Sequence, residues 1–202
     1  MNEEKVNSNT PDIETERLVL RKFTMVDTES LFAILKDKEV NTFLPWFPFE
    51  TITETEKHLQ EYYLKSYTHP MGYRYAICLK SDNLPIGYIH VSTDESHDFG
   101  YGLRKEFWHR GIVTEACTAT IEQLRKDGFS YMTATHDVNN PRSGAVMKKL
   151  GMTYRYSYEE QWQPKDILVT FRMYQLNFDG TNGGTYNKYW EKYPVHFIEE
   201  NI

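Results

Sequence analysis

One stretch of the sequence decides the fold, Trp108-His109-Arg110-Gly111-Ile112-Val113-Thr114-Glu115-Ala116. It follows a strand-like run at 99–103, and apolar residues recur after it at the three- and four-residue spacing of a helix face. A strand, a tight turn with glycine and basic residues, and a helix therefore follow one another. The first turn of a helix has unpaired backbone N–H groups and a partial positive charge, which stabilise an anion such as a pyrophosphate. The stretch predicts an anion-binding turn.

A second helix is predicted at 140–150. Asn140 is a good N-cap, and Pro141 suits the first helical position because its ring has no N–H to leave unpaired. Gly151 suits the left-handed conformation that ends a helix. Ser143 falls on the apolar stripe of this helix, so we expect it to face the interior. The other members of the stripe are Val146, Met147 and Leu150.

With these two motifs the chain resembles the GNAT acetyl-coenzyme A-dependent N-acetyltransferases, in particular their ribosomal-protein (RimJ/RimL-like) branch. Residues 14–21, Glu-Thr-Glu-Arg-Leu-Val-Leu-Arg, are similar to the opening strand of that branch, and 108–116 to its pyrophosphate loop. The resemblance covers 13–176. The chain departs from the family at two places. Trp108 and Val113 replace the first and last residues of the common loop, and Met147 stands where many relatives have a tyrosine that protonates the leaving thiolate.

The resemblance implies an α+β fold with a mixed, mostly antiparallel central sheet, flanked by helices and with splayed central strands. It implies transfer of an acetyl group from acetyl-CoA to a primary amine, either a protein N-terminus or a small cationic amine, by direct attack on the thioester. The two departures leave an alternative, a non-catalytic module that binds or senses acyl-CoA. The expected cofactor-binding residues are Tyr101, Gly102, Leu103, His109, Arg110, Gly111, Ile112, Val113, Thr114, Asn140 and Ser143.

The resemblance suggests three catalytic candidates. Ser143 can donate a proton to the departing sulfur, or its hydroxyl can simply bond its own helix. Asp98 adjoins the strand at 99–103 expected to flank the thioester, and Glu160 lies where this branch can carry an acidic residue near the acceptor. Either carboxylate can be the base, or be only solvated. Glycines at 100 and 102 indicate a bulge or a close approach, where exposed N–H groups of splayed strands can bind the acyl oxygen.

The order of predicted elements divides the chain into a polar N-terminal arm (1–12), an acetyltransferase domain (13–176) and an aromatic C-terminal extension (177–202). A capping-box pattern, Thr24-x-x-Asp27, predicts a helix to about Lys38. A further helix is expected from Ile52 to Tyr63. The expected strands are 18–23, 73–79, 86–91, 99–103, 131–138, 153–160 and 167–176.

Two aromatic segments permit more than one interpretation. The run at 45–49, Pro-Trp-Phe-Pro-Phe, can anchor a loop or form an acceptor wall. The extension places five aromatic residues after a glycine-rich turn at 180–184, and these can pack on the domain itself, reach a second subunit in a homodimer, or cover the acceptor site. They are Tyr186, Tyr189, Trp190, Tyr193 and Phe197.

Composition sets the remaining expectations. The net charge is −6, yet 104–149 carries eight Lys and Arg against five Asp and Glu, so the remainder is −9. A basic island suits the phosphates of coenzyme A, and an acidic remainder suits a cationic amine and disfavours nucleic acid, although charges also scatter by chance. The histidines lack metal-ligand spacing, and the sequence has no GxGxxG or Walker pattern. We expect no metal and no membrane segment, with reduced cysteines in a cytoplasmic protein.

Overall fold

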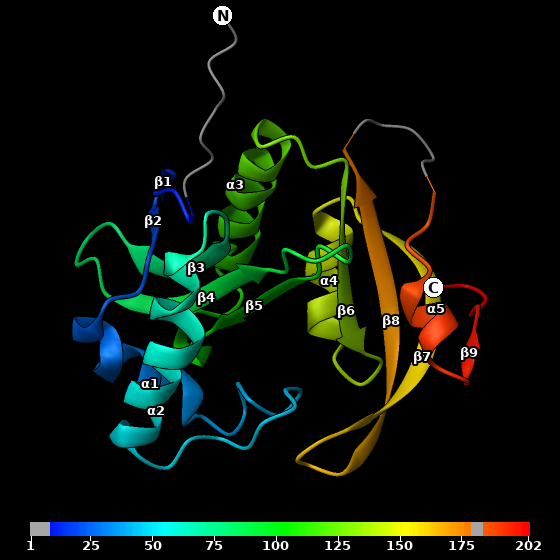
Figure 1. Cartoon of the computed structure of the whole chain (residues 1–202), viewed down its shortest axis with the longest axis horizontal. Coiled ribbons are helices and arrows are strands. Elements are labelled where there is room, and N and C mark those ends of the chain that lie inside the picture. Colours follow the sequence, from blue (N-terminus) through cyan, green and yellow to red (C-terminus); the bar gives the residue numbers. More distant parts are fainter. Residues whose placement is uncertain (1–8, 179–183) are drawn as a thin grey trace, which may run out of the picture.

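The computed structural model describes residues 9–178 and 184–202 (Figure 1). The predicted polar arm (1–12) falls largely outside these residues, as does most of the turn predicted at 180–184. The first sheet is antiparallel, in the order β1-β2-β3-β4-β5. Its strands are β1 (Ile13–Glu14), β2 (Leu18–Arg21), β3 (Tyr73–Leu79), β4 (Pro85–Val91) and β5 (Phe99–Leu103). The second sheet is also antiparallel, in the order β6-β8-β7-β9. Its strands are β6 (Tyr131–Asp137), β7 (Thr153–Trp162), β8 (Ile167–Asn177) and β9 (His196–Phe197).

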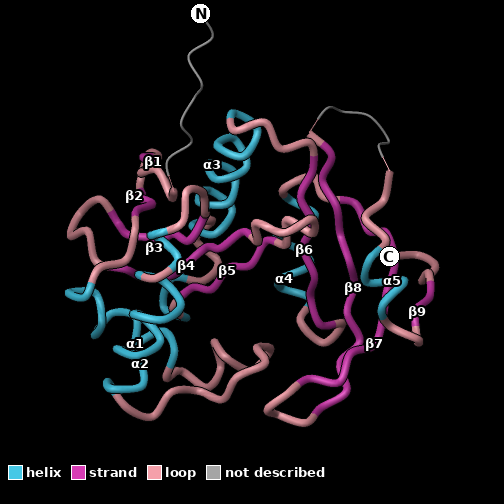
Figure 2. Tube along the Cα trace, in the orientation of Figure 1, coloured by secondary structure: helices cyan, strands magenta, loops and turns pink. Residues whose placement is uncertain are grey.

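Helices cover both faces of this strand array (Figures 1 and 2). One face of the first sheet packs on α1 (Thr28–Leu35) and on α2 (Ile52–His58), which continues as a π-helical turn, Leu59–Leu64. The other face packs on α3 (Ile112–Lys126) and α4 (Pro141–Lys149), and this core runs on into β6 and β8. The last helix, α5 (Lys188–Lys192), lies against β7. The expected α+β arrangement of antiparallel sheets flanked by helices is therefore confirmed.

The two sheets splay apart between β5 and β6. Within residues 9–178 and 184–202, a single parallel bridge between Asp98 and Thr133 joins them, and Thr133 N donates to His97 O at 3.3 Å beside it. Beyond that bridge the two strands diverge toward their carboxyl ends, as Figure 2 shows. Because the ladder stops there, backbone groups on the facing edges of β5 and β6 are free to bind something other than a strand.

Local side-chain bonds explain two differences from the predicted elements. Residues 14–21, which resemble a single opening strand, form β1 and β2, because Thr15 forms a turn in which Leu18 N donates to its hydroxyl at 3.0 Å. The strand expected at 18–23 ends at Arg21. The helix expected to reach Lys38 ends at Leu35. There, Asn41 Nδ2 donates to Ile34 O at 2.9 Å and so uses a carbonyl that another helical turn would need.

The C-terminal extension packs on its own domain. Tyr193 stacks on Tyr158 of β7 with ring centroids 4.7 Å apart and an interplanar angle of 9°, and Trp190 meets Tyr156 edge-on at 5.5 Å. These rings and Tyr189 cover a cluster of buried side chains from β7 and β8. The extension thus supplies one layer of the second half of the molecule.

Candidate active site

The turn before α3 presents backbone donors to the outside. Gly111 is the N-cap residue with φ +73°, and His109 also has a positive φ of 59°. The first bond into this helix is donated by Glu115 N to Gly111 O at 3.0 Å. Within the described parts of the chain, the N–H groups from His109 to Thr114 donate to no other group. A run of such donors at a helix N-terminus forms a concave anion-binding nest.

The carboxylate of Glu115, in the first turn of α3, is hydrogen-bonded to Thr15 and Arg17. Glu115 accepts from Thr15 Oγ1 at 2.6 Å, from Arg17 N at 3.0 Å and from Arg17 Nε at 2.7 Å, while Arg17 Nη1 donates to Arg110 O at 3.0 Å. Burial raises the pKa of Glu115, but the bonds from Thr15 and Arg17 outweigh it and hold the pKa below its ordinary value. These contacts link the motif at 14–21 to the one at 108–116, and sequence reasoning missed the link.

Trp108 and Arg142 add to the same end of the site. Trp108 Nε1 donates to Leu103 O at 2.8 Å, which fixes the turn to the end of β5. Arg142, in the first turn of α4, lies over the Trp108 ring at 4.9 Å from its centroid. The tryptophan that departs from the common loop pattern therefore has a structural role, and Arg142 brings a positive charge that was not among the expected residues.

Successive residues of β5 direct their backbone N–H and C=O groups to opposite sides of the strand. Ser92 N donates to Asp98 O at 2.8 Å and Arg104 N to Ile86 O at 2.9 Å, so alternation along an antiparallel pair turns the N–H and C=O groups of Gly102 toward β4. Those of Tyr101 and Leu103 point toward β6, where the sheets diverge. Of the three expected residues on this strand, Tyr101 and Leu103 thus have an N–H available to a ligand in the gap.

The gap is bridged by side chains. Tyr101 Oη lies 2.9 Å from Ser143 O and 2.9 Å from Ser143 Oγ. The Ser143 hydroxyl thus bonds Tyr101, and the alternative in which it bonds its own helix was wrong. Burial raises the pKa of the Tyr101 phenol, so it stays protonated at neutral pH. The hydroxyl groups of Tyr101 and Ser143 therefore meet between β5 and α4. Ser143 is one helical turn before Met147, the position at which many relatives have a tyrosine.

The two candidate bases lie in different surroundings. Asp98 has a buried Oδ1 with no hydrogen-bond partner among the described residues, and burial followed by repulsion from Asp94 raises its pKa to about 7. Glu160, on β7, lies near the phenol of Tyr193 in the extension. A pKa of about 7 suits Asp98 to act as a base near neutrality.

A profile of the acetyltransferase (GNAT) domain matches residues 17–153. The chain belongs to the GNAT acetyltransferase family. The uncharacterized N-acetyltransferase YoaA of Bacillus subtilis is 26% identical over 146 residues, which cover 70% of this chain and 82% of YoaA. The uncharacterized N-acetyltransferase YnaD of Bacillus subtilis is 22% identical to this chain over 192 residues, which cover 93% of this chain and 97% of YnaD. A crystal structure of RimL, the ribosomal L7/L12 α-N-protein acetyltransferase, with coenzyme A shares the fold at a TM-score of 0.73 and 21% identity, covering 85% and 100%.

The glycines of β5 make room for side chains of β4 in this GNAT domain. A Cβ at Gly100 would lie 2.2 Å from the His90 ring, and one at Gly102 would lie 2.5 Å from the Tyr88 ring. The pairing of β4 with β5 is regular, so the alternative of a bulge was wrong. His90 and Tyr88, which the sequence interpretation overlooked, thus form the surface of the sheet beside the gap.

The aromatic run at 45–49 combines two of its expected features. Trp46 Nε1 donates to Asn41 Oδ1 at 3.2 Å, whereas Phe47 is 58% exposed, so this run contains both an anchor and a free aromatic ring.

Among the described residues, no group of three or more His, Cys, Asp or Glu side chains is arranged to hold a metal ion. No described helix is both long and apolar enough to cross a membrane. Cys78 and Cys117 are free and buried.

Replacing Asn140 by alanine is expected to destabilise the GNAT domain. The Asn140 side chain accepts from Ser143 N at 3.4 Å and so caps α4, as predicted. Loss of such a cap lowers the free energy of unfolding by about 1 kcal/mol, measurable by urea denaturation. Asn139→Ala is the matched control, because Asn139 is exposed and does not cap the helix. Equal stability of Asn140→Ala and wild type would show that the cap contributes nothing.

Proposed function

We propose that this GNAT protein transfers an acetyl group from acetyl-CoA to a primary amine by direct attack of the amine on the thioester. The observation that carries the proposal is the nest of six N–H groups from His109 to Thr114 beside the splayed strands. The relatives support it, since RimL was solved with coenzyme A and the self-immunity acetyltransferase MccE with acetyl-CoA. A cytoplasmic location follows, because acetyl-CoA is available there.

The residues present fit a pyrophosphate at this turn. Its backbone donors are unpaired, and Arg110 and Arg142 add positive charge nearby, with Arg142 Nη1 also 3.7 Å from the exposed Glu39 Oε1. Glu115, the acidic residue of the first helical turn, is paired with Arg17 and so does not repel an anion. Ile112 is buried in the core at 4% exposure, so it contributes its N–H rather than its side chain. Charge and donors thus agree on an anionic ligand.

The chemistry assigns roles to the groups around the gap. As the nitrogen–carbon bond forms and the carbon–sulfur bond breaks, the amine nitrogen loses a proton and the thiolate gains one. Asp98, in its ionised form, accepts the proton of the amine directly or through water. Ser143, held by Tyr101, donates to the sulfur. The N–H groups of Tyr101 and Leu103 stabilise the charge that develops on the acyl oxygen.

The acceptor is proposed to be a cationic primary amine, either a protein N-terminus or a small molecule. The acidic balance of −9 outside 104–149 attracts a positive group, and attraction of this kind weakens as salt rises. Solved neighbours with the same fold include a structure described as a putative ribosomal-protein-serine acetyltransferase from Vibrio cholerae. A non-catalytic acyl-CoA-binding module is the alternative, which the departures at Trp108, Val113 and Met147 favour.

Asp98→Asn is expected to remove a limb from the pH–rate profile. In wild type, kcat/KM rises with pH through a pKa of about 7, because the ionised carboxylate is the base. Because the pKa of Asp98 is raised, the folded protein holds a proton on Asp98 between the ordinary aspartate pKa and about pH 7, where the unfolded chain does not. The free energy of unfolding therefore falls as pH rises through that range, and Asp98→Asn lacks this fall. Glu160→Gln is the comparison, and an unchanged profile in Asp98→Asn would exclude Asp98 as the base.

A panel of amines and peptides, assayed for thiol release from acetyl-CoA, tests the proposed function. It compares small polyamines, amino acids and short peptides with free N-termini. The expected result is amine-dependent thiol release for at least one class. Tight binding of acetyl-CoA without thiol release across the panel would favour the acyl-CoA-binding module.

A further inference from the structure

Arg74 on β3 is a half-buried cation without an anion. Its guanidinium forms no ion pair and no hydrogen bond with any residue in 9–178 or 184–202, and its Nη1 is buried and unpartnered. The Tyr62 ring lies under it, 3.8 Å from Cζ to the centroid. That contact stabilises the charge but satisfies none of the N–H donors in the guanidinium plane. Burying such a donor without a partner is costly, so a group that is bound only in the working protein is the natural explanation.

The imidazole and phenol groups on this face are neutral and can donate hydrogen bonds. Burial, followed by the positive charge of Arg74, lowers the pKa of His58 and of His90 to about 4, so both imidazoles are neutral. Tyr88 Oη is buried and, like Arg74 Nη1, has no partner among the described residues. Its ring is stacked near His90 with centroids 6.4 Å apart. A cation and neutral groups that can donate hydrogen bonds are thus gathered on one face. The exposed carboxylate of Glu61 acts on His58 but, among the described residues, forms no ion pair with Arg74.

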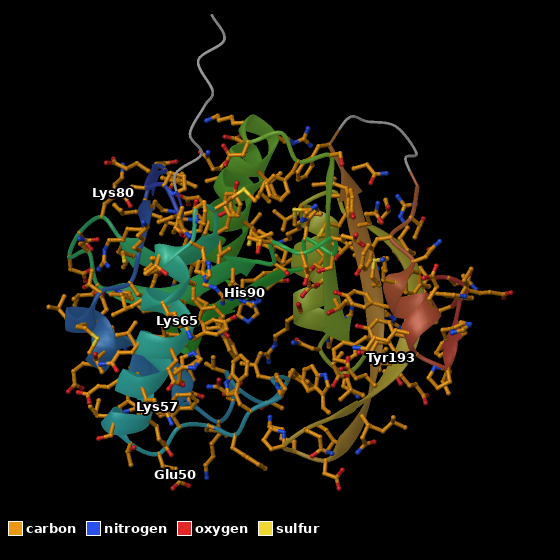
Figure 3. All side chains as sticks on the ribbon, viewed as in Figure 1. Glu50, Lys57, Lys65, Lys80, His90 and Tyr193 are labelled. Atoms are coloured by element: carbon orange, nitrogen blue, oxygen red, sulfur yellow. The ribbon has the colours of Figure 1, made fainter. Side chains whose placement is uncertain are left out.

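This cluster lies on the face of the sheet away from α3. Arg74 is in register with His90, and His90 with Gly100 on β5, so the three form a row that leads across β3 and β4 to the strand at the gap. With strands about 4.8 Å apart, the backbone of Arg74 is about 10 Å from that of Gly100. The His90 and Tyr88 rings fill the space over Gly100 and Gly102 on this face, whereas Tyr101 faces Ser143 on the other. Figure 3 shows His90 near the middle of the molecule.

We propose that Arg74, with His90 and Tyr88, forms an oxyanion subsite that binds a carboxylate or phosphate group of the amine acceptor. The planar guanidinium matches either group with two parallel hydrogen bonds, and His90 and Tyr88 can donate further bonds. The acceptor is then an amine that also carries an oxyanion several bonds from its nitrogen. This inference rests on the proposed function and narrows its substrate class. It is separate from the pyrophosphate turn, which lies at the start of α3.

Binding of simple anions tests the subsite without turnover. Glutarate and inorganic phosphate are titrated calorimetrically into the full chain saturated with coenzyme A, which occupies the turn at 109–114. Glutaramide serves as the uncharged probe. At least one anion is expected to bind to wild type and to lose tenfold or more in affinity in Arg74→Gln. A preference for glutarate indicates a carboxylate and a preference for phosphate a phosphate ester.

Two further variants make the result specific. Arg74→Lys keeps the charge without the planar fork and is expected to bind with intermediate affinity. Arg125→Gln is the matched control, because Arg125 also lies over an aromatic ring but donates to Phe178 O at 2.8 Å and is remote from this row. It should bind the anions as wild type does. Equal affinity of wild type and Arg74→Gln, or no binding of either anion to wild type, would overturn the subsite.

Turnover separates failure of the subsite from failure of the proposed function. With 4-aminobutyrate and its amide as acceptors, the subsite predicts a higher kcat/KM for the carboxylate, which Arg74→Gln reduces tenfold or more to the level of the amide. If no amine is acetylated yet glutarate binds through Arg74, the transferase proposal fails and the subsite stands. If amines are acetylated and Arg74→Gln binds and reacts as wild type does, only the subsite fails.

Discussion

Gly111→Asp is expected to weaken acetyl-CoA binding by more than tenfold, about 1.4 kcal/mol. Gly111 has φ +73°, a conformation that costs a residue with a Cβ about 1–2 kcal/mol, and the variant also places a negative charge where the phosphates bind. A Cβ there would meet only Arg17 Nη2, at 3.6 Å, so steric overlap is not the cause. Isothermal titration calorimetry with acetyl-CoA measures the change.

Gly128→Asp controls for the strain. Gly128 also has a positive φ, +88°, and a Cβ built on it would have no heavy atom within 4 Å. It follows the C-terminal end of α3, opposite the end that carries the turn. The control should lose stability but bind acetyl-CoA as wild type does. If a folded Gly111→Asp protein kept wild-type affinity, the turn at 109–114 would not be the pyrophosphate site.

Ser143→Ala is expected to lower kcat at least tenfold while leaving the affinity for acetyl-CoA nearly unchanged. A proton donor acts as the thiolate leaves, so its loss slows the reaction more than it weakens binding. Steady-state rates with saturating acceptor, together with calorimetry, separate the two effects. Wild-type turnover in this variant would return Ser143 to a purely structural role.

Tyr101→Phe should reproduce part of that loss. It removes the Oη that lies 2.9 Å from Ser143 Oγ, and the effects of the two substitutions should not add in the double variant, because both act on one hydrogen-bonded pair. Tyr75→Phe is the matched control, since the Tyr75 hydroxyl is buried and has no partner among the described residues. Additive effects of Tyr101→Phe and Ser143→Ala would show that the two hydroxyls act separately.

Local signals were enough to predict much of the fold. The strand-like runs at 73–79 and 99–103 predicted β3 and β5 with the bounds observed, and the Asn-Pro start and Gly151 predicted α4 within a residue at each end. Each of these signals depends on neighbours in the chain. The early end of α1 was not predictable in this way, because it depends on how the side chain of Asn41 folds back onto Ile34 O.

The missed parts of the site depend on long-range contacts. Glu115 is bound by Thr15 and Arg17 from about a hundred residues away, and nothing in either motif alone indicates that they meet. The reason for Gly100 lies in the His90 ring on a neighbouring strand. The absent tyrosine at position 147 suggested a lost donor, but Tyr101 reaches Ser143 from another element. Burial of Asp98 and of Arg74 Nη1 likewise exists only in the folded chain.

The path of the acetyl group tests the central claim most directly. The protein is mixed with acetyl-CoA that carries an isotope label in the acetyl group, then with an amine acceptor identified by the panel, and the label is followed by mass spectrometry over a single turnover. Direct transfer predicts that the protein mass stays unchanged at every time point and that labelled N-acetyl product and free thiol form in equal amounts only after the amine is added. Label on the protein before the amine arrives, or thiol release without acetylated amine, would contradict the account.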